Sequence, residues 1–158
     1  MMNQLSNWIN SVSVYADMSP DLAIRSQVNH WLQTRTRLAL TLTAWCHLFS
    51  DQSSDREVLA FVYQRFSEYS GLEFGRVRPD DRLNADLNLA LVCWHDWVIT
   101  FCEDFCEQFH VDLSDYFDED DFETIGELVA FLHAEVVRSR KKPQAPRLKV
   151  VVSRMSAA

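Results

Sequence analysis

Apolar side chains recur every three or four positions over long stretches of the chain, a spacing that places them on one face of an α-helix. The clearest stripe lies within residues 96–109 and consists of Val98, Phe101, Cys102, Phe105 and Phe109. An earlier stripe consists of Val58, Phe61, Val62, Phe66 and Tyr69. A later stripe consists of Ile125, Leu128, Val129, Phe131 and Leu132. The three stripes predict a bundle of amphipathic helices.

Local start signals precede these helices. Ser54 stands three residues before Glu57, the spacing of a capping box, and Thr124 immediately precedes the last stripe. The Ser54 hydroxyl is therefore expected to cap a helix, and the last helix is expected to begin after Thr124. Ser19-Pro20-Asp21 is a further start signal, because Pro is tolerated in a first helical turn.

Stop signals and loops separate the stripes. Gly71 and Gly75 are expected to end the helix that carries the earlier stripe. Residues 76–85 should form an ordered loop, and residues 111–117 a short connection.

Residues 31–49 fit two patterns. Leu38, Leu42, Trp45 and Phe49 lie on one face of a helix, whereas Leu38, Leu40 and Leu42 alternate as in a β-strand. No Gly or Pro interrupts residues 21–70, which favours the helix.

Composition agrees with a folded, helical protein. Hydrophobic residues make up 47% and aromatic residues 12% of the chain, enough apolar surface to exclude a wholly disordered protein. Three Gly and four Pro among 158 residues are too few for collagen or a turn-rich β-sandwich. We therefore expect an all-α fold.

Charge is distributed unevenly along the chain. The net charge is −8, but residues 1–137 hold all 23 acidic residues and eight basic ones, which gives 8 − 23 = −15. Residues 138–158 hold the other seven basic residues. The body should repel nucleic acid and attract a basic protein partner, and only the tail could bind polyanions.

These patterns divide the chain into three parts. Residues 1–50 are interpreted as an N-terminal helical extension, which could cover the bundle or form a homodimer. Residues 51–137 form the helical bundle, and residues 138–158 form a basic tail. Within the tail, Leu148–Val152 could pair as an edge strand, although a mobile tail is the favoured interpretation.

The cysteines and apolar runs indicate a cellular location. Four Cys residues occur without the framework of a small disulfide-rich domain. The most apolar stretch, residues 38–49, is shorter than a membrane span, and no secretory signal is evident. We expect a cytoplasmic protein with reduced thiols and no membrane span.

Residues 55–136 resemble an acyl carrier protein. The run Asp80–Leu87 is similar to the segment before the second helix of that family, and Phe109–Phe117 is similar to the end of this helix and the hydrophobic step after it. Thr124-Ile125-Gly126-Glu127-Leu128 resembles the start of the last carrier helix. Phe109–Phe117 also resembles a group of uncharacterised bacterial carrier-like proteins. The resemblance implies a helical bundle with an acidic face that docks basic partners.

One departure separates the chain from working carriers. The family attaches phosphopantetheine to a Ser at the start of the second helix, which corresponds here to residues 95–97, and residues 71–113 contain no Ser. We therefore expect no phosphopantetheine, no other cofactor and no catalysis. The leading hypothesis is a non-catalytic interaction module. The alternatives are a carrier modified at another residue and a small metal or thiol enzyme.

A metal or thiol site would use the Cys and His residues of the second half. The candidate ligands are Cys93, His95, Cys102, Cys106 and His110. Cys102 and Cys106 share the apolar stripe of residues 96–109, which favours burial in the core over metal binding. Cys46-His47 and the Cys93/His95 pair are the candidate nucleophile–base pairs, although sequence neighbours rarely adopt that geometry.

The expected partner-binding surface combines acidic and aromatic residues. Trp94 and Trp97 flank the start of a helix, and at least one should pack inward while the other could anchor a partner. The candidate contact residues are Trp94, Asp96, Trp97, Asp112, Asp115, Asp118, Asp120 and Asp121. The acidic run after residue 111 lacks the alternation and central Gly of an EF-hand, so it is interpreted as a solvated or docking face.

Overall fold

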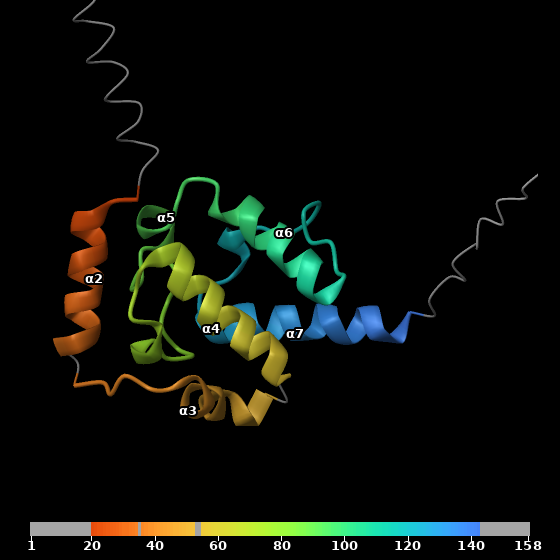
Figure 1. Ribbon diagram of the computed structural model, residues 1–158, viewed down its shortest axis with the longest axis horizontal. Coiled ribbons are helices and arrows are strands. Elements are labelled where there is room, and N and C mark those ends of the chain that lie inside the picture. The colour runs from red at the N-terminus through yellow and green to blue at the C-terminus, as the bar shows by residue number, and fades with distance from the viewer. Residues whose placement is uncertain (1–19, 35, 53–54, 143–158) are drawn as a thin grey trace, which may run out of the picture.

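The computed structural model describes residues 20–34, 36–52 and 55–142. These residues form α-helices and short 3₁₀ helices joined by loops, with no β-strand among them (Figure 1). The order is α2 (Leu22–Thr34), α3 (Leu42–Cys46), η1 (His47–Gln52), α4 (Arg56–Ser70), η2 (Phe74–Arg76), α5 (Leu89–Val92), α6 (Trp97–Phe109), η3 (Glu119–Asp121) and α7 (Ile125–Lys141). The predicted all-α helical bundle is confirmed.

Helix α4 contacts α3, α5, η2 and α7. It is capped by Asp55, one residue after the expected cap, and the Asp55 carboxylate accepts a hydrogen bond of 3.0 Å from the Glu57 N–H. The helix ends as predicted at Gly71, which has a φ of 65°. Its apolar stripe is buried, including Phe61 and Phe66.

The helix favoured over residues 31–49 is wrong as a continuous element. Residues 37–41 have no regular secondary structure between α2 and α3, so they are not a β-strand either. Their polar backbone groups bind the rest of the protein: the Leu40 N–H donates to the Gly75 carbonyl at 2.9 Å, and the Tyr63 hydroxyl donates to the Leu40 carbonyl at 2.9 Å. These distant partners offset the helical hydrogen bonds that the segment gives up.

Gly75 has a structural role that differs from the predicted helix stop. A Cβ atom at this position would lie 2.5 Å from the Leu40 carbonyl oxygen and 3.1 Å from the Tyr63 hydroxyl. The absence of a side chain therefore lets the 37–41 segment cross η2 closely enough to form its backbone hydrogen bond.

The expected boundary at residue 50 falls inside η1, and side chains from both sides of it share one core. Leu32, Trp45 and Phe49 belong to the same buried cluster as the stripes of α4, α6 and α7. The Trp45 ring contacts Phe49 and Phe74, with ring centroids 4.7 and 5.7 Å apart.

The predicted boundaries of the second half are close to the observed ones. Helix α6 covers Trp97–Phe109, against the 96–109 expected. Helix α7 begins after Thr124, whose hydroxyl accepts from the Glu127 N–H while the Glu127 carboxylate accepts from the Thr124 N–H. An isolated antiparallel bridge between Arg82 and Thr124 ties the ordered 76–85 loop to this helix start.

Replacing Thr124 with alanine is expected to lower the free energy of unfolding by about 1 kcal/mol, because the first turn of α7 loses a capping hydrogen bond. Chemical denaturation of the variant measures this loss. Thr43→Ala serves as a control, because it removes an exposed hydroxyl that accepts from the Arg56 guanidinium at 3.1 Å but caps no helix, and an equal loss in both variants would contradict the capping role.

Some expectations concern residues outside the described ranges. The apolar residues within 1–18, the Ser19 start signal, the Ser54 cap and the possible strand at Leu148–Val152 all lie there. Among the helices of the described residues, none combines the length and apolar character needed to cross a membrane.

Candidate docking groove on α6

The outer face of α6 and the segment that follows it enclose an open groove of about 500 Å³. It is lined by Val98, Ile99, Cys102, Glu103, Cys106, Glu107, Asp112, Ser114 and Phe117. The opposite face of α6 packs into the core, where Phe101 and Phe105 are fully buried. Helix α6 thus presents apolar side chains on two faces, of which the core covers one.

The floor and rim of this docking groove differ in chemistry. Apolar atoms come from residues such as Val98 and Phe117, and Ile99 leaves 63% of its surface exposed. Glu103, Glu107 and Asp112 bring carboxylates to the same groove. An apolar floor with an acidic rim suits a ligand that has both apolar and cationic groups.

The 111–117 segment closes one side of the groove because its start and middle are anchored. His110 ends α6 in the left-handed conformation with a φ of 57°, and its N–H donates to the Cys106 carbonyl at 2.9 Å. Val111 and Leu113 are buried. This turn places Asp112 at the rim.

Asp112 is held ionised by its own turn. Its carboxylate accepts hydrogen bonds from the hydroxyl and the N–H of Ser114, the latter at 3.0 Å. These bonds, the hydroxyl first, lower the pKa of Asp112 below its usual value. The rim therefore keeps this negative charge at neutral pH.

The two tryptophans at the start of α6 have opposite surroundings. Trp94 is 54% exposed, whereas Trp97 is 6% exposed and packs its ring 5.6 Å from Phe66 and 6.2 Å from Phe101. The prediction that one Trp packs inward is confirmed. The assignment of Trp97 as a partner anchor is wrong, because Trp97 lies four residues before Phe101 and so on the inner face of α6. Trp94 is the exposed candidate.

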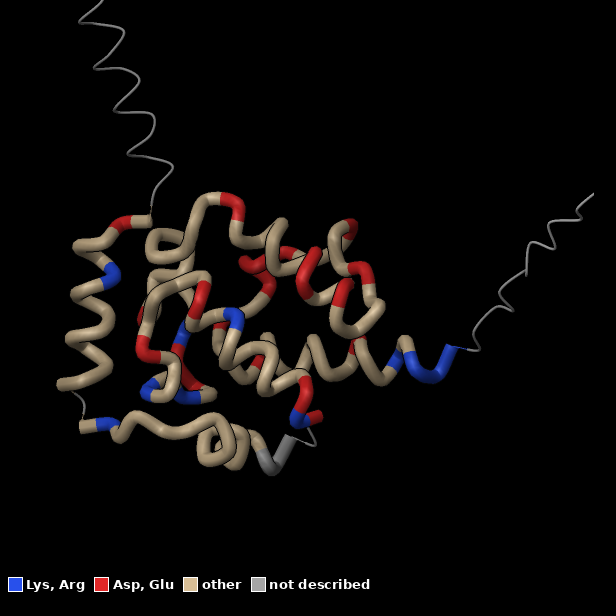
Figure 2. The backbone as a smooth tube through the Cα atoms, in the orientation of Figure 1, with Lys and Arg blue, Asp and Glu red and all other residues tan. Residues whose placement is uncertain are grey.

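The predicted acidic contact residues do not form one site. Asp112 lies at the docking groove, and Asp115 is exposed on the loop after it. Asp120 and Asp121 line a separate hollow of about 490 Å³, together with Glu123, Glu127 and Arg82. Asp96 precedes the first turn of α6, and Asp118 caps η3. Figure 2 shows acidic positions on α6 and on the loops after it, with basic positions gathered at the end of α7.

Sequence reasoning missed Ile99, Glu103 and Glu107. A readable signal existed: Ile99, Glu103 and Glu107 follow each other at intervals of four, so they share a face of α6. Whether an apolar residue on this face lines a groove, however, depends on where the 111–117 segment packs.

The Cys and His candidates are dispersed. Cys93 and Cys102 are buried, whereas His95 and His110 are exposed. His110 leaves the helix at its C-cap, which breaks the expected continuation of the Cys102/Cys106 face. Among the residues that the structure describes, no three His, Cys, Asp or Glu side chains are grouped so that they could hold a metal ion.

Burial raises the pKa of the thiols. The pKa of Cys93 rises to about 12 and that of Cys102 to about 11, and burial also raises the pKa of Cys46. An activated nucleophile needs the opposite shift. Cys106, expected to be buried like Cys102, is only half-buried at the groove.

Cys93 and Cys102 are expected to react with N-ethylmaleimide more slowly than Cys46 at pH 8. A pKa of about 11 in place of 9.0 lowers the thiolate fraction of Cys102 about a hundredfold at that pH. The shift is upward, so reactivity should increase as the pH rises toward the folded pKa. Peptide mapping by mass spectrometry gives the three rates, and in denaturant the differences should vanish. Equal rates in the native protein would contradict this order.

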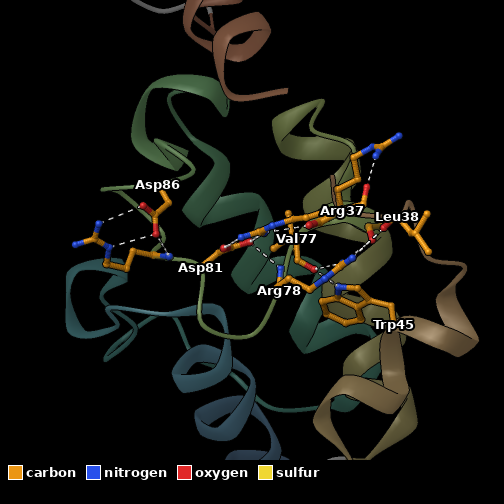
Figure 3. A network of polar contacts seen from close by, with 10 residues as sticks. Arg37, Leu38, Trp45, Val77, Arg78, Asp81 and Asp86 are labelled. Atoms are coloured by element: carbon orange, nitrogen blue, oxygen red, sulfur yellow. Dashed lines mark hydrogen bonds and ion pairs between the residues drawn. The ribbon is translucent and has the colours of Figure 1, made fainter. Parts of the chain in front are cut away.

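A second feature that sequence reasoning missed is a polar network beside η2 (Figure 3). Asp81 is 3% exposed, and its carboxylate accepts hydrogen bonds from the Arg37 guanidinium at 2.5 and 2.9 Å and from the Arg78 N–H at 2.7 Å. The Arg78 guanidinium donates to the Leu38 and Gly75 carbonyls at 2.9 Å. The indole N–H of Trp45 donates to the Val77 carbonyl at 3.0 Å.

This network is structural. Asp81 also accepts, through its carbonyl, a hydrogen bond of 3.1 Å from the Ile125 N–H at the start of α7. The hydrogen bond to Asp81 raises the pKa of Arg37, so the guanidinium remains charged. The network joins the 37–41 segment, the 76–85 loop and α7, and it holds the bundle that carries the docking groove.

Comparison with protein-family models found no match, and comparisons with curated proteins and with solved structures found none either.

Proposed function

We propose that this chain is a non-catalytic protein-interaction module, a degenerate acyl-carrier-like domain that binds a basic, amphipathic segment of a partner protein in the docking groove on α6. The observation that carries the proposal is the combination of an uncovered apolar floor, with Ile99 63% exposed, and a rim of Glu103, Glu107 and Asp112. Apolar side chains of the partner would enter the floor, and its Lys or Arg residues would meet the rim.

The resemblance to carrier proteins supports this proposal. Helices α4, α6 and α7 follow the order of the first, second and last carrier helices, and the acidic groove lies on the helix that corresponds to the second. The position of the carrier Ser falls near His95-Asp96-Trp97, and none of these side chains has a hydroxyl. The raised pKa values of Cys93 and Cys102 disfavour these two thiols as catalytic nucleophiles.

The floor and the rim of the groove should affect binding in different ways. Burial of apolar surface contributes roughly 25 cal/mol per Å², so the floor should supply most of the residence time. Exposed ion pairs contribute about 0.2–1 kcal/mol each and mainly speed the encounter. Binding should therefore depend on both Ile99 and the carboxylates, with only the carboxylate contribution weakened by salt.

A synthetic helical peptide with Leu on one face and Lys on the other tests the proposal. The double variant Glu103→Gln/Glu107→Gln should bind this peptide about two- to thirtyfold more weakly, from two exposed ion pairs of ~0.2–1 kcal/mol each, and its binding should depend less on salt. Ile99→Ser should weaken binding by faster dissociation at every salt concentration. Surface plasmon resonance measures both rates.

Matched variants outside the groove provide the controls. Leu22→Ser removes an apolar side chain that is 67% exposed on α2, and it should leave binding unchanged. The triple variant Asp118→Asn/Asp120→Asn/Asp121→Asn removes charge around the other hollow, so it should slow association less than the double variant does. If the triple variant has the larger effect, or if a scrambled peptide binds equally well, the docking groove is the wrong site.

A further inference from the structure

The chain leaves its described part beside the docking groove. Helix α7 ends with Arg138, Arg140 and Lys141 in its last turn. Lys142 follows and lines a hollow of about 340 Å³ together with His110, Asp112, Tyr116 and Glu135. Asp112 also lines the docking groove, so the two hollows adjoin at this residue. Figure 2 shows the same arrangement, with the basic end of α7 near the acidic positions of α6 and the following loop.

The sequence after Lys142 contains cationic and apolar side chains, which complement the docking groove. Residues 143–158 contain Arg147, Lys149 and Arg154 and no acidic residue. Leu148-Lys149-Val150-Val151-Val152 combines apolar side chains with a cation, and Arg147 precedes it. This segment complements an apolar floor with an acidic rim.

Chain length permits the contact. Five residues separate Lys142 from Leu148, and an extended chain spans about 3.3–3.6 Å per residue, so Leu148 can lie up to about 20 Å from Lys142. Pro143 and Pro146 disfavour a continuation of α7 away from the body. A short linker also gives the segment an effective concentration in the millimolar range, so a weak contact suffices.

We propose that Leu148–Val152, with Arg147 beside it, occupies the docking groove of the same molecule, so that a basic partner must displace this segment to bind. The inference rests on the proposed function, because it makes the basic tail a competitive inhibitor of the docking groove. A partner that makes more apolar contacts or carries more cations than the tail binds the groove more tightly and displaces the tail. A weakly basic protein does not displace it. The tail thus sets the minimum affinity that a partner needs in order to occupy the docking groove.

Cys106 reports on the contact in the full chain, because this half-buried thiol lines the groove. The variant Arg147→Gln/Lys149→Gln/Val151→Ser removes the complementary groups of the tail and leaves the described helices intact. For a tail contact with a Kd of about 0.3 mM against an effective concentration of ~1 mM, the groove is covered about three quarters of the time. Cys106 labelling should then be about fourfold slower in the wild-type chain than in the variant. The half-buried Cys46 on α3, which Figure 1 places far from α6, should react equally in both.

The amphipathic Leu/Lys peptide separates the two proposals. Slower Cys106 labelling in the wild type, together with tighter peptide binding by the tail variant, supports the tail contact. Equal Cys106 rates and equal peptide affinities overturn it and leave the proposed function standing. Protection of Cys106 without peptide binding to either chain upholds the contact and overturns the proposed function. Protection that increases with protein concentration assigns the groove to a second copy and overturns the intramolecular contact.

Discussion

Replacing Asp81 with alanine is expected to lower the free energy of unfolding by about 3–5 kcal/mol, the typical cost of breaking a buried ion pair. The Asp81 side chain is 3% exposed and that of Arg37 13% exposed. Without the carboxylate, the Arg37 guanidinium loses its counter-charge and keeps the neutral Arg76 carbonyl, at 3.2 Å, as an acceptor. The Arg78 N–H loses its acceptor as well. The loss therefore comes mostly from a partly buried charge without its counter-charge and from an N–H without its acceptor, rather than from the attraction itself.

Chemical denaturation followed by circular dichroism measures this loss. Asp80→Ala, at the exposed neighbouring position, should change stability by less than about 0.5 kcal/mol. The double variant Arg37→Met/Asp81→Leu should recover much of the stability, because apolar groups of similar volume can replace a buried ion pair. A loss below 1 kcal/mol for Asp81→Ala would show that the pair is effectively solvated.

Replacing Trp45 with alanine is expected to cost about 3–5 kcal/mol, since it removes a large, fully buried side chain and leaves a cavity. The Trp45 ring packs on Phe49, Tyr63 and Phe74, so the cavity would lie where α3 meets α4 and η2. The buried Val77 carbonyl would also lose the indole N–H as its donor. The substitution should therefore loosen the N-terminal part of the core.

Two further variants help to assign this loss of stability to its causes. Trp45→Phe keeps most of the apolar volume and removes the hydrogen bond, so it should cost less than Trp45→Ala. Trp94→Ala, at an exposed position, should have little effect on stability. Thermal unfolding by calorimetry gives all three values. Equal losses for Trp45→Ala and Trp94→Ala would contradict the placement of Trp45 in the core.

Several features of the fold were readable from the sequence because they depend on residues close together in the chain. The start of α7 after Thr124 was predicted, and the cap at this start joins Thr124 and Glu127 across only three positions. The inner face of α6 follows from the spacing of Phe101 and Phe105, since a 3.6-residue period places them on one side wherever the helix lies. The predicted all-α fold depends on the same periodicity.

Other features depended on contacts between distant residues. The break at residues 37–41 occurs because the Gly75 carbonyl, the Tyr63 hydroxyl and the Arg78 guanidinium bind backbone groups of this segment. The alternation of Leu38, Leu40 and Leu42 was the local signal against a helix, and the absence of Gly and Pro favoured the wrong element. The burial of Asp81 likewise depends on Arg37, which is 44 residues away in the chain.

The candidate site likewise combines features set by residues close together in the chain with features set by contacts between distant residues. That Glu103 and Glu107 share a face of α6 follows from helical geometry. Only the tertiary structure decides that Ile99 on this face remains uncovered and that Asp112 comes to the rim, because the turn at His110 directs the 111–117 segment back along α6. Local periodicity determines which side chains a helix presents together, whereas the packing of distant segments determines which of its faces stays open to a partner.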